Sequence, residues 1–161
     1  MKKAPQYQAL TAIHILSISI GAIYCCFGFL KFFHNYSPAE KLAIDTIDIL
    51  TFHLLPKRFS LGMLAVAECA IGLLLLMRSW MKPVLVAMFV HMFFTFTPFL
   101  LFPQQTFGNL PHGLTLLGQY IMKNIVVLSA GWVLWQYFVK GGSSILVVPK
   151  MNEKENTQAA A

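Results

Sequence analysis

The stretch LTLLGQYIMKNIVVLSAGWVLWQYF, residues 114–138, decides the fold of this chain. It is long enough to cross a bilayer, since a helix needs about 20 mainly apolar residues to span about 30 Å of hydrocarbon. Its first half nevertheless contains Gln119, Lys123 and Asn124. A charged side chain at membrane depth is costly, so Lys123 is a candidate functional residue and needs a partner.

Three further apolar runs, at 10–33, 59–77 and 83–102, have a similar length. Hydrophobic residues make up 57% of the chain, charged residues only 11%, and the mean hydropathy is +0.66. These values are far from those of a soluble domain. The sequence therefore predicts an all-α fold: a four-transmembrane-helix bundle over residues 1–140, followed by a largely disordered cytoplasmic tail at 141–161.

The basic residues flank the apolar runs and do not gather on one face, so the net charge of +6 does not indicate a nucleic-acid partner. The N-terminus, the second connection and the tail carry more Lys and Arg than the first and third connections, which places both termini in the cytoplasm. The run at 10–33 is too long for a signal-peptide core and lacks an A-x-A-like site. We interpret it as an uncleaved first span.

The first connection predicts an amphipathic helix over about 38–54. Ser37 is suited to the N-cap and Pro38 to the first helical position, and apolar residues then recur at three- and four-residue steps up to Pro56. Such a helix is too polar to span and should lie along the outer interface. The third connection, FPQQTFGNLPHG, is rich in turn-forming residues and predicts a loop.

The cysteines give no sign of a redox or metal centre. Cys25 and Cys26 are adjacent and Cys69 is far away, so neither a C-x-x-C motif nor a zinc-ligand spacing is present. We interpret all three as small packing residues.

Glu68 and Lys123 stand at the same depth in the predicted bundle. Each comes nine residues after the outer start of its span, about 13 Å below the boundary at 1.5 Å per residue. We therefore expect Glu68 to hold Lys123. His91 falls near the midplane of the third span, and the side chain of Gln119 shares a helix face with Lys123.

Glu68, His91, Gln119 and Lys123 form a predicted polar seam at mid-depth, and two other polar residues complete it. Asn124 points about 100° away from Lys123 and can reach another neighbour. Lys31 ends the first span, where its ammonium either lifts to the interface or joins the seam. The candidate binding residues are Lys31, Glu68, His91, Gln119, Lys123 and Asn124. A haem site is disfavoured, because His14 and His91 lie at different depths.

Five segments carry a family resemblance: GFLKFF (28–33), SPAEKLA (37–43), LAVAECAIGLLLL (64–76), TFTPFLLFP (95–103) and LLGQYIMKNIVVL (116–128). Together they resemble the DoxX-like family of small four-helix bacterial membrane proteins, near the inner-membrane subgroup linked to reactive-chlorine resistance. The resemblance implies a location in the bacterial inner membrane and a quinone-linked redox role, since the family takes its name from a thiosulfate:quinone oxidoreductase subunit. Where some members have an acid after the lysine of the last segment, this chain has Asn124.

The residues leave more than one function open. In the first, the seam binds a quinone head group: Lys123 donates to a carbonyl, His91 relays a proton and Glu68 balances charge. Another redox membrane subunit is then the expected partner. In the second, the protein is a non-catalytic structural or partner-binding subunit, and the buried pair only organises the bundle. A transporter of a small anion or proton is a third, which with four spans would require a homo-oligomer.

Overall fold

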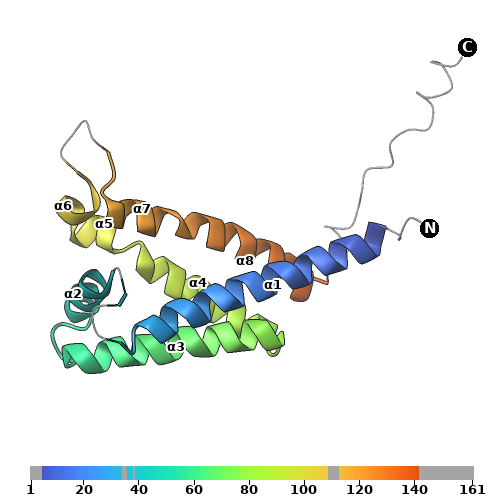
Figure 1. Ribbon diagram of the computed structural model, residues 1–161, viewed down its shortest axis with the longest axis horizontal. Coiled ribbons are helices and arrows are strands. Elements are labelled where there is room, and N and C mark those ends of the chain that lie inside the picture. Colours follow the sequence, from blue (N-terminus) through green and yellow to red (C-terminus); the bar gives the residue numbers. More distant parts are fainter. Residues whose placement is uncertain (1–4, 34–35, 38, 109–112, 142–161) are drawn as a thin grey trace, which may run out of the picture.

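The computed structural model describes residues 5–33, 36–37, 39–108 and 113–141, and the regular elements within them are all helices (Figure 1). The predicted tail from 142 onward lies outside these residues. The helices are α1 (Pro5–Leu30), α2 (Glu40–Leu50), α3 (Lys57–Met77), α4 (Met81–Thr95), α5 (Pro98–Leu101), α6 (Pro103–Thr106), α7 (Leu116–Met122) and α8 (Asn124–Phe138).

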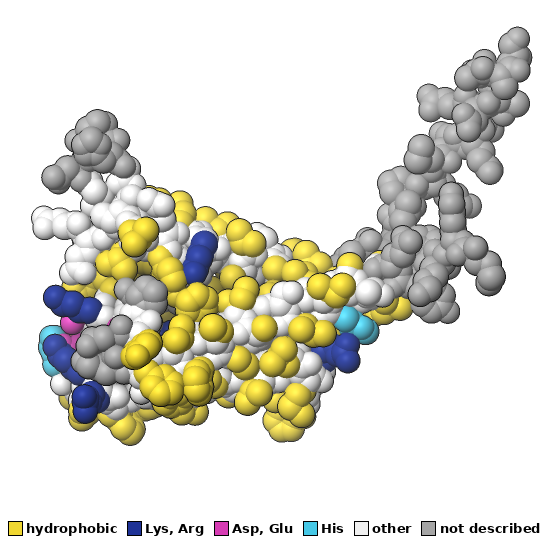
Figure 2. Space-filling view, viewed as in Figure 1, with side chains coloured by type: hydrophobic (Ala, Val, Ile, Leu, Met, Phe, Trp, Pro, Cys, Tyr) yellow, Lys and Arg dark blue, Asp and Glu magenta, His cyan; other side chains and the backbone are white. Residues whose placement is uncertain are grey.

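Four segments of the described chain are long and apolar enough to cross a membrane, which confirms the prediction of four spans. They are Ala9–Leu30, Lys57–Met77, Met81–Leu101 and Leu116–Phe138. Large apolar side chains cover the flank of the molecule, and the charged ones in view gather mainly at its two ends (Figure 2). The protein is a multi-pass membrane protein. The start of α1 and the end of α8 lie at one end of the bundle, opposite α2 (Figure 1).

Helices α1 and α3 run side by side in close contact (Figure 1). A Cβ added to Gly72 would lie 2.7 Å from the backbone nitrogen of Cys25, and one added to Gly28 would lie 2.9 Å from that of Cys69. Small residues at such a contact let two backbones approach closely, which is a common way for helices to associate in membranes. Cys25 and Cys69 are free thiols packed at this contact, as expected of small packing residues, whereas Cys26 is exposed.

The end of the bundle away from α2 is closely packed. Arg78 takes a left-handed conformation after α3, with φ 54°, and the amide of Ser79 donates to the carbonyl of Leu74. This arrangement satisfies carbonyls at the end of the helix and lets α4 begin three residues later, so α3 and α4 are antiparallel neighbours. The buried residues here include Leu75, Leu85 and Leu134, whose side chains are fully buried.

The third span changes direction between α4 and α5. Pro98 has no amide hydrogen, so it cannot donate to the carbonyl of Phe94 one turn earlier. The hydroxyl of Thr97 donates to that carbonyl instead, at 2.7 Å, and the Thr97 amide donates to it at 3.2 Å. The backbone therefore stays hydrogen-bonded at a break, as it must at membrane depth.

The fourth span consists of α7 and α8, which meet at Lys123; this residue keeps a right-handed helical conformation, and its amide donates to the carbonyl of Gln119 at 3.2 Å. Thr115 caps α7 by accepting a hydrogen bond from the amide of Gly118. The connection before it is not wholly a loop as predicted: α6 forms one turn after Pro103, and Phe107 pairs with Leu114 in an isolated antiparallel bridge. Residues 109–112 lie outside the described part.

Helix α2 is shorter than the predicted range 38–54. It begins at Glu40 and ends at Leu50; Pro38 lies outside the described residues. The early end has a local cause, because Phe52 and His53 take positive φ values of 53° and 59° and the amide of His53 donates to the carbonyl of Asp48. His53 also pairs with the Asp48 carboxylate at 2.9 Å.

Candidate functional site

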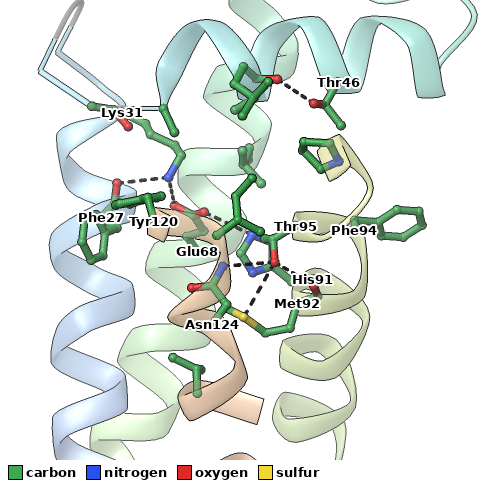
Figure 3. A pocket seen from close by; sticks show the side chains of 18 of the residues that line it. Phe27, Lys31, Thr46, Glu68, His91, Met92, Phe94, Thr95, Tyr120 and Asn124 are labelled. Atoms are coloured by element: carbon green, nitrogen blue, oxygen red, sulfur yellow. Dashed lines mark hydrogen bonds and ion pairs between the residues drawn. The ribbon is translucent and has the colours of Figure 1, made fainter. Parts of the chain in front are cut away.

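A cavity of about 460 Å³ lies within the half of the bundle next to α2 (Figure 3). Sites for small molecules commonly have volumes of about 300–1,000 Å³ and mainly apolar walls with a few convergent polar groups. Helix α2 lies across one end of this cavity, to which it contributes Leu42, Ala43, Thr46 and Ile47. The polar groups come from α1, α2, α3, α4, α7 and α8, and from Lys31, Ser37 and Lys123, which lie outside or between these helices.

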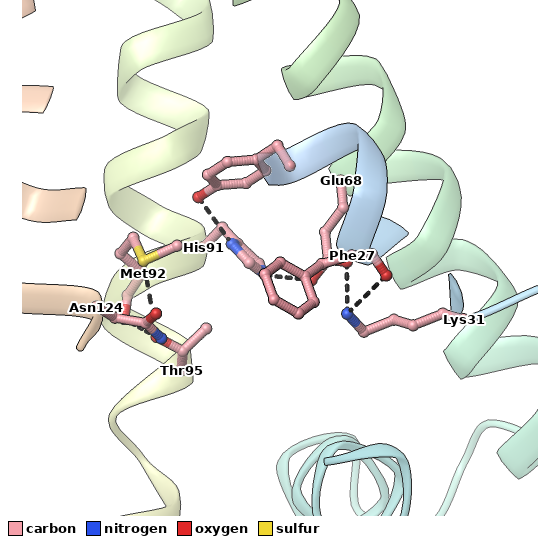
Figure 4. Close-up of polar contacts among 8 residues, drawn as sticks. Phe27, Lys31, Glu68, His91, Met92, Thr95 and Asn124 are labelled. Carbon is pink, nitrogen blue, oxygen red and sulfur yellow. Dashed lines mark hydrogen bonds and ion pairs between the residues drawn. The ribbon is translucent and has the colours of Figure 1, made fainter. Parts of the chain in front are cut away.

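A chain of four polar side chains forms part of the cavity wall (Figure 4). Lys31 Nζ lies 2.6 Å from Glu68 Oε2, and Glu68 Oε1 lies 3.1 Å from His91 Nε2. The other ring nitrogen of His91, Nδ1, lies 3.0 Å from the hydroxyl of Tyr24. The chain therefore connects α1, α3 and α4 and returns to α1.

The neutral imidazole with its proton on Nε2 satisfies both contacts of His91. Nε2 then donates to the Glu68 carboxylate, and Nδ1 accepts from the Tyr24 hydroxyl. With Lys31 and Glu68 both ionised and His91 neutral, these four side chains together have no net charge. Each buried side-chain nitrogen or oxygen among the described residues has a hydrogen-bond partner, as polar groups at membrane depth require.

The expectation that Glu68 holds Lys123 is wrong: Glu68 pairs with Lys31 and His91. Equal depth fixes the level of two side chains but not the direction in which each points around its helix. The main neighbour of α3 is α1, which brings Lys31 to the carboxylate. The open question about Lys31 is thereby resolved, because its side chain is only 9% exposed and turns into the bundle.

Lys123 lines the same cavity but contacts aromatic rings. Its Nζ lies 3.7 Å from the ring centroid of Tyr120 and 4.5 Å from that of Phe27. An ammonium over an aromatic face is attracted by the ring quadrupole. No ion pair joins this ammonium to any carboxylate in the part of the chain that the structure describes.

Asn124 and Gln119 behave differently from each other. The side-chain amide of Asn124 donates to Thr95 Oγ1 at 3.2 Å, which ties α8 to α4 beside the cavity. Gln119 is exposed, donates to the carbonyl of Leu114 at 3.1 Å and does not line the cavity. The structure thus brings together Lys31, Glu68, His91, Lys123 and Asn124 of the predicted set.

Tyr24, Phe27 and Tyr120 line the cavity but were not among the residues predicted from the sequence. A spacing signal existed for the first two, because Tyr24 and Phe27 precede Lys31 by seven and four residues and so share its helix face. Tyr120 precedes Lys123 by three residues, one turn earlier. Aromatic residues are frequent throughout the spans, so residue type alone did not distinguish these three from the others.

The site can donate hydrogen bonds and hold protons. Among the described residues no group of three or more His, Cys, Asp or Glu side chains is placed to hold a metal ion. A ligand in the cavity would meet an imidazole, a tyrosine hydroxyl, an amide and an ammonium, surrounded by apolar walls. Comparison of the chain with protein-family models, with curated proteins and with solved structures finds no match.

Proposed function

We propose that this chain is a quinone-binding, redox-linked subunit of the DoxX-like kind. The observation that carries the proposal is the cavity itself, which lies among the spans and combines apolar walls with the chain Lys31–Glu68–His91–Tyr24. A quinone has a flat apolar ring and two carbonyl oxygens that accept hydrogen bonds. Its reduction takes up protons, and groups that can supply protons at membrane depth are those gathered here.

The break in the third span supports a binding role. Phe96 and Thr97 lie between α4 and α5, and Thr95 and Pro98 on either side of them line the cavity. Broken helices at membrane depth are tolerated where they line a cavity or lie within protein, and several membrane proteins bind their substrates at such breaks. A continuous helix would serve a purely structural bundle equally well.

We further propose a bacterial inner-membrane location with both termini in the cytoplasm, so that α2 lies along the outer interface. The polar side of α2 carries Lys41, Asp45 and Asp48, while Leu42 and Thr46 are buried toward the bundle. Reporter fusions after residues 54 and 141 test this orientation. We expect alkaline phosphatase to be active only at the first position, and activity at the second alone would reverse the topology.

The binding experiment uses the full-length protein in lipid nanodiscs and decylubiquinone as the ligand. Ala43→Phe on α2 should fill the cavity without touching the polar chain and reduce the affinity at least about tenfold. Ala87→Phe is the matched control, because Ala87 lies on an exposed face of α4 outside the cavity. Absence of binding to the unaltered protein, or equal loss in both variants, would contradict the proposal.

One observation favours the alternative of a non-catalytic structural or partner-binding subunit. Glu68 is already balanced by Lys31 and bonded to His91, so the pair satisfies itself without a ligand. If this alternative holds, the double variant Glu68→Gln with Lys31→Met should restore both the stability and the cellular function that either single change lowers. Restored stability without restored function would favour the quinone-binding role.

A further inference from the structure

The charges around the cavity do not balance. Glu68 is the sole acidic residue within the four spans, and two lysines, Lys31 and Lys123, line the cavity with it. The Lys31 ammonium pairs with the Glu68 carboxylate, with Nζ 2.6 Å from Oε2. Whatever the protonation state of His91, the lining therefore carries an excess of positive charge, and the Lys123 ammonium is the cation that no carboxylate of the described residues pairs with.

The position of Lys123 makes this excess charge costly. Lys123 comes seven residues after the start of its span at Leu116, about 10 Å along the helix axis. At that depth an ammonium cannot easily reach the headgroup layer, and charges inside the membrane are normally paired. The Lys123 residue is exposed on the surface of the described bundle; the rings of Tyr120 and Phe27 attract its ammonium but carry no charge to cancel its own.

We propose that the occupant of the cavity is an acidic ring compound, ionised when bound, whose negatively charged oxygen pairs with Lys123. This inference rests on the proposed function and narrows it from quinones in general to those that carry an ionised oxygen. The ring lies among the apolar side chains, and the ammonium, held by the two aromatic rings, meets the charged oxygen. A charge-assisted hydrogen bond of this kind is stronger than one to a neutral carbonyl.

The geometry of the cavity favours a ligand within it over a lipid phosphate as the source of the negative charge. Lys123 lines the cavity together with Asn124 and Tyr120, so an oxygen placed there would contact groups from one side of a single pocket. A phosphate of the outer leaflet would have to descend by about 10 Å to reach the ammonium. A ring compound in the cavity and a lipid phosphate would both offer a negatively charged oxygen, and the experiment distinguishes between these two sources.

The test compares two ligands that differ at one ring position: dimethylnaphthoquinone, which is neutral, and phthiocol, in which an ionised hydroxyl replaces one methyl. Both are titrated against the full-length protein in nanodiscs of phosphatidylcholine at neutral pH. We expect phthiocol to bind about tenfold more tightly or better. Lys123→Gln should remove this preference, so that the affinities for the two ligands lie within about twofold of each other, while Lys123→Arg should retain the preference.

Lys140→Gln is the matched control. The Lys140 ammonium also lies over an aromatic ring, 5.6 Å from the centroid of Trp132, but Lys140 does not line the cavity. Its replacement should change neither affinity. A second arm repeats the titration with phosphatidylglycerol in the disc, which supplies lipid phosphates that also carry a negative charge.

Each outcome decides the inference. Equal binding of the two ligands to the unaltered protein, or a preference that survives Lys123→Gln, overturns it and leaves the quinone-binding proposal intact. Loss of the preference when phosphatidylglycerol is added assigns the charge to a lipid phosphate and also overturns it. Failure of both ligands to bind counts against the proposed function itself.

Discussion

The two ends of the bundle are built in different ways from the same four spans. Away from α2, residues such as Leu85 and Leu134 are fully buried and the helices close on one another. Next to α2 the helices leave a cavity of about 460 Å³ with a polar chain along its wall. The closed end is held together by apolar packing, whereas the open end holds the polar groups of the candidate site.

The largest expected effect is at the open end, on replacing Glu68 with Gln. The change leaves the buried Lys31 ammonium without its carboxylate, and breaking a buried pair in this way costs about 3 kcal/mol or more. Thermal unfolding of the purified protein in detergent measures the loss. The double variant with Lys31→Met should recover most of it, and an unaltered Tm in the Glu68→Gln protein would contradict the network seen here.

Truncating leucines at the two ends should give unequal losses. Leu134→Ala removes a fully buried side chain and should cost about 2 kcal/mol. Inside a membrane this cost comes from lost packing contacts, since lipid is as apolar as the protein interior. Leu50→Ala at the cavity, where the side chain is 38% exposed, should cost less than about 0.5 kcal/mol.

Chemical denaturation of both variants in the same detergent provides the comparison. A loss at Leu50 as large as that at Leu134 would mean that the cavity is closed in solution. The difference between the ends would then be one of side-chain type and not of packing.

The contact between α1 and α3 offers a third comparison, within one helix. Gly72→Ala would place a methyl group 2.7 Å from the backbone nitrogen of Cys25, so the two helices must separate, at a cost of about 1.5 kcal/mol. Gly62→Ala, also in α3, meets nothing within 4 Å and should be neutral or slightly stabilising. Unfolding of the two variants side by side measures the difference, and equal stabilities would contradict the close approach.

The fold could be predicted from sequence to a greater extent than the site. Span existence depends on the length of apolar runs, which is a local property, and the four runs became four spans. Helix ends were less predictable: α2 stops at Leu50 because Phe52 and His53 adopt left-handed conformations, which are uncommon for residues other than glycine.

The members of the candidate site were predicted better than their partners. Placing an ionisable side chain at membrane depth is costly, and this alone marks Lys31, Glu68, His91 and Lys123 as candidates without a structure. All four line the cavity. The partner of Glu68 depends on which helices are neighbours and how each is rotated. Neither property can be read from a single span. Depth alone therefore predicted Lys123 as the partner of Glu68, whereas the packing of α1 on α3 brings Lys31 to the carboxylate.

The smallest expected effect on stability comes from the hydrogen bond between Asn124 and Thr95, which joins α8 to α4 beside the cavity. Hydrogen bonds between membrane helices contribute about 0.6 kcal/mol on average in double-mutant cycles. We expect a coupling of that size from Asn124→Ala, Thr95→Val and the double variant, measured by unfolding in detergent. Thr95 also donates to the carbonyl of Met92 at 2.7 Å, so its own replacement should cost more than the coupling. A coupling near zero would mean that Asn124 is free to turn toward a ligand, and its affinity effect would then exceed its effect on stability.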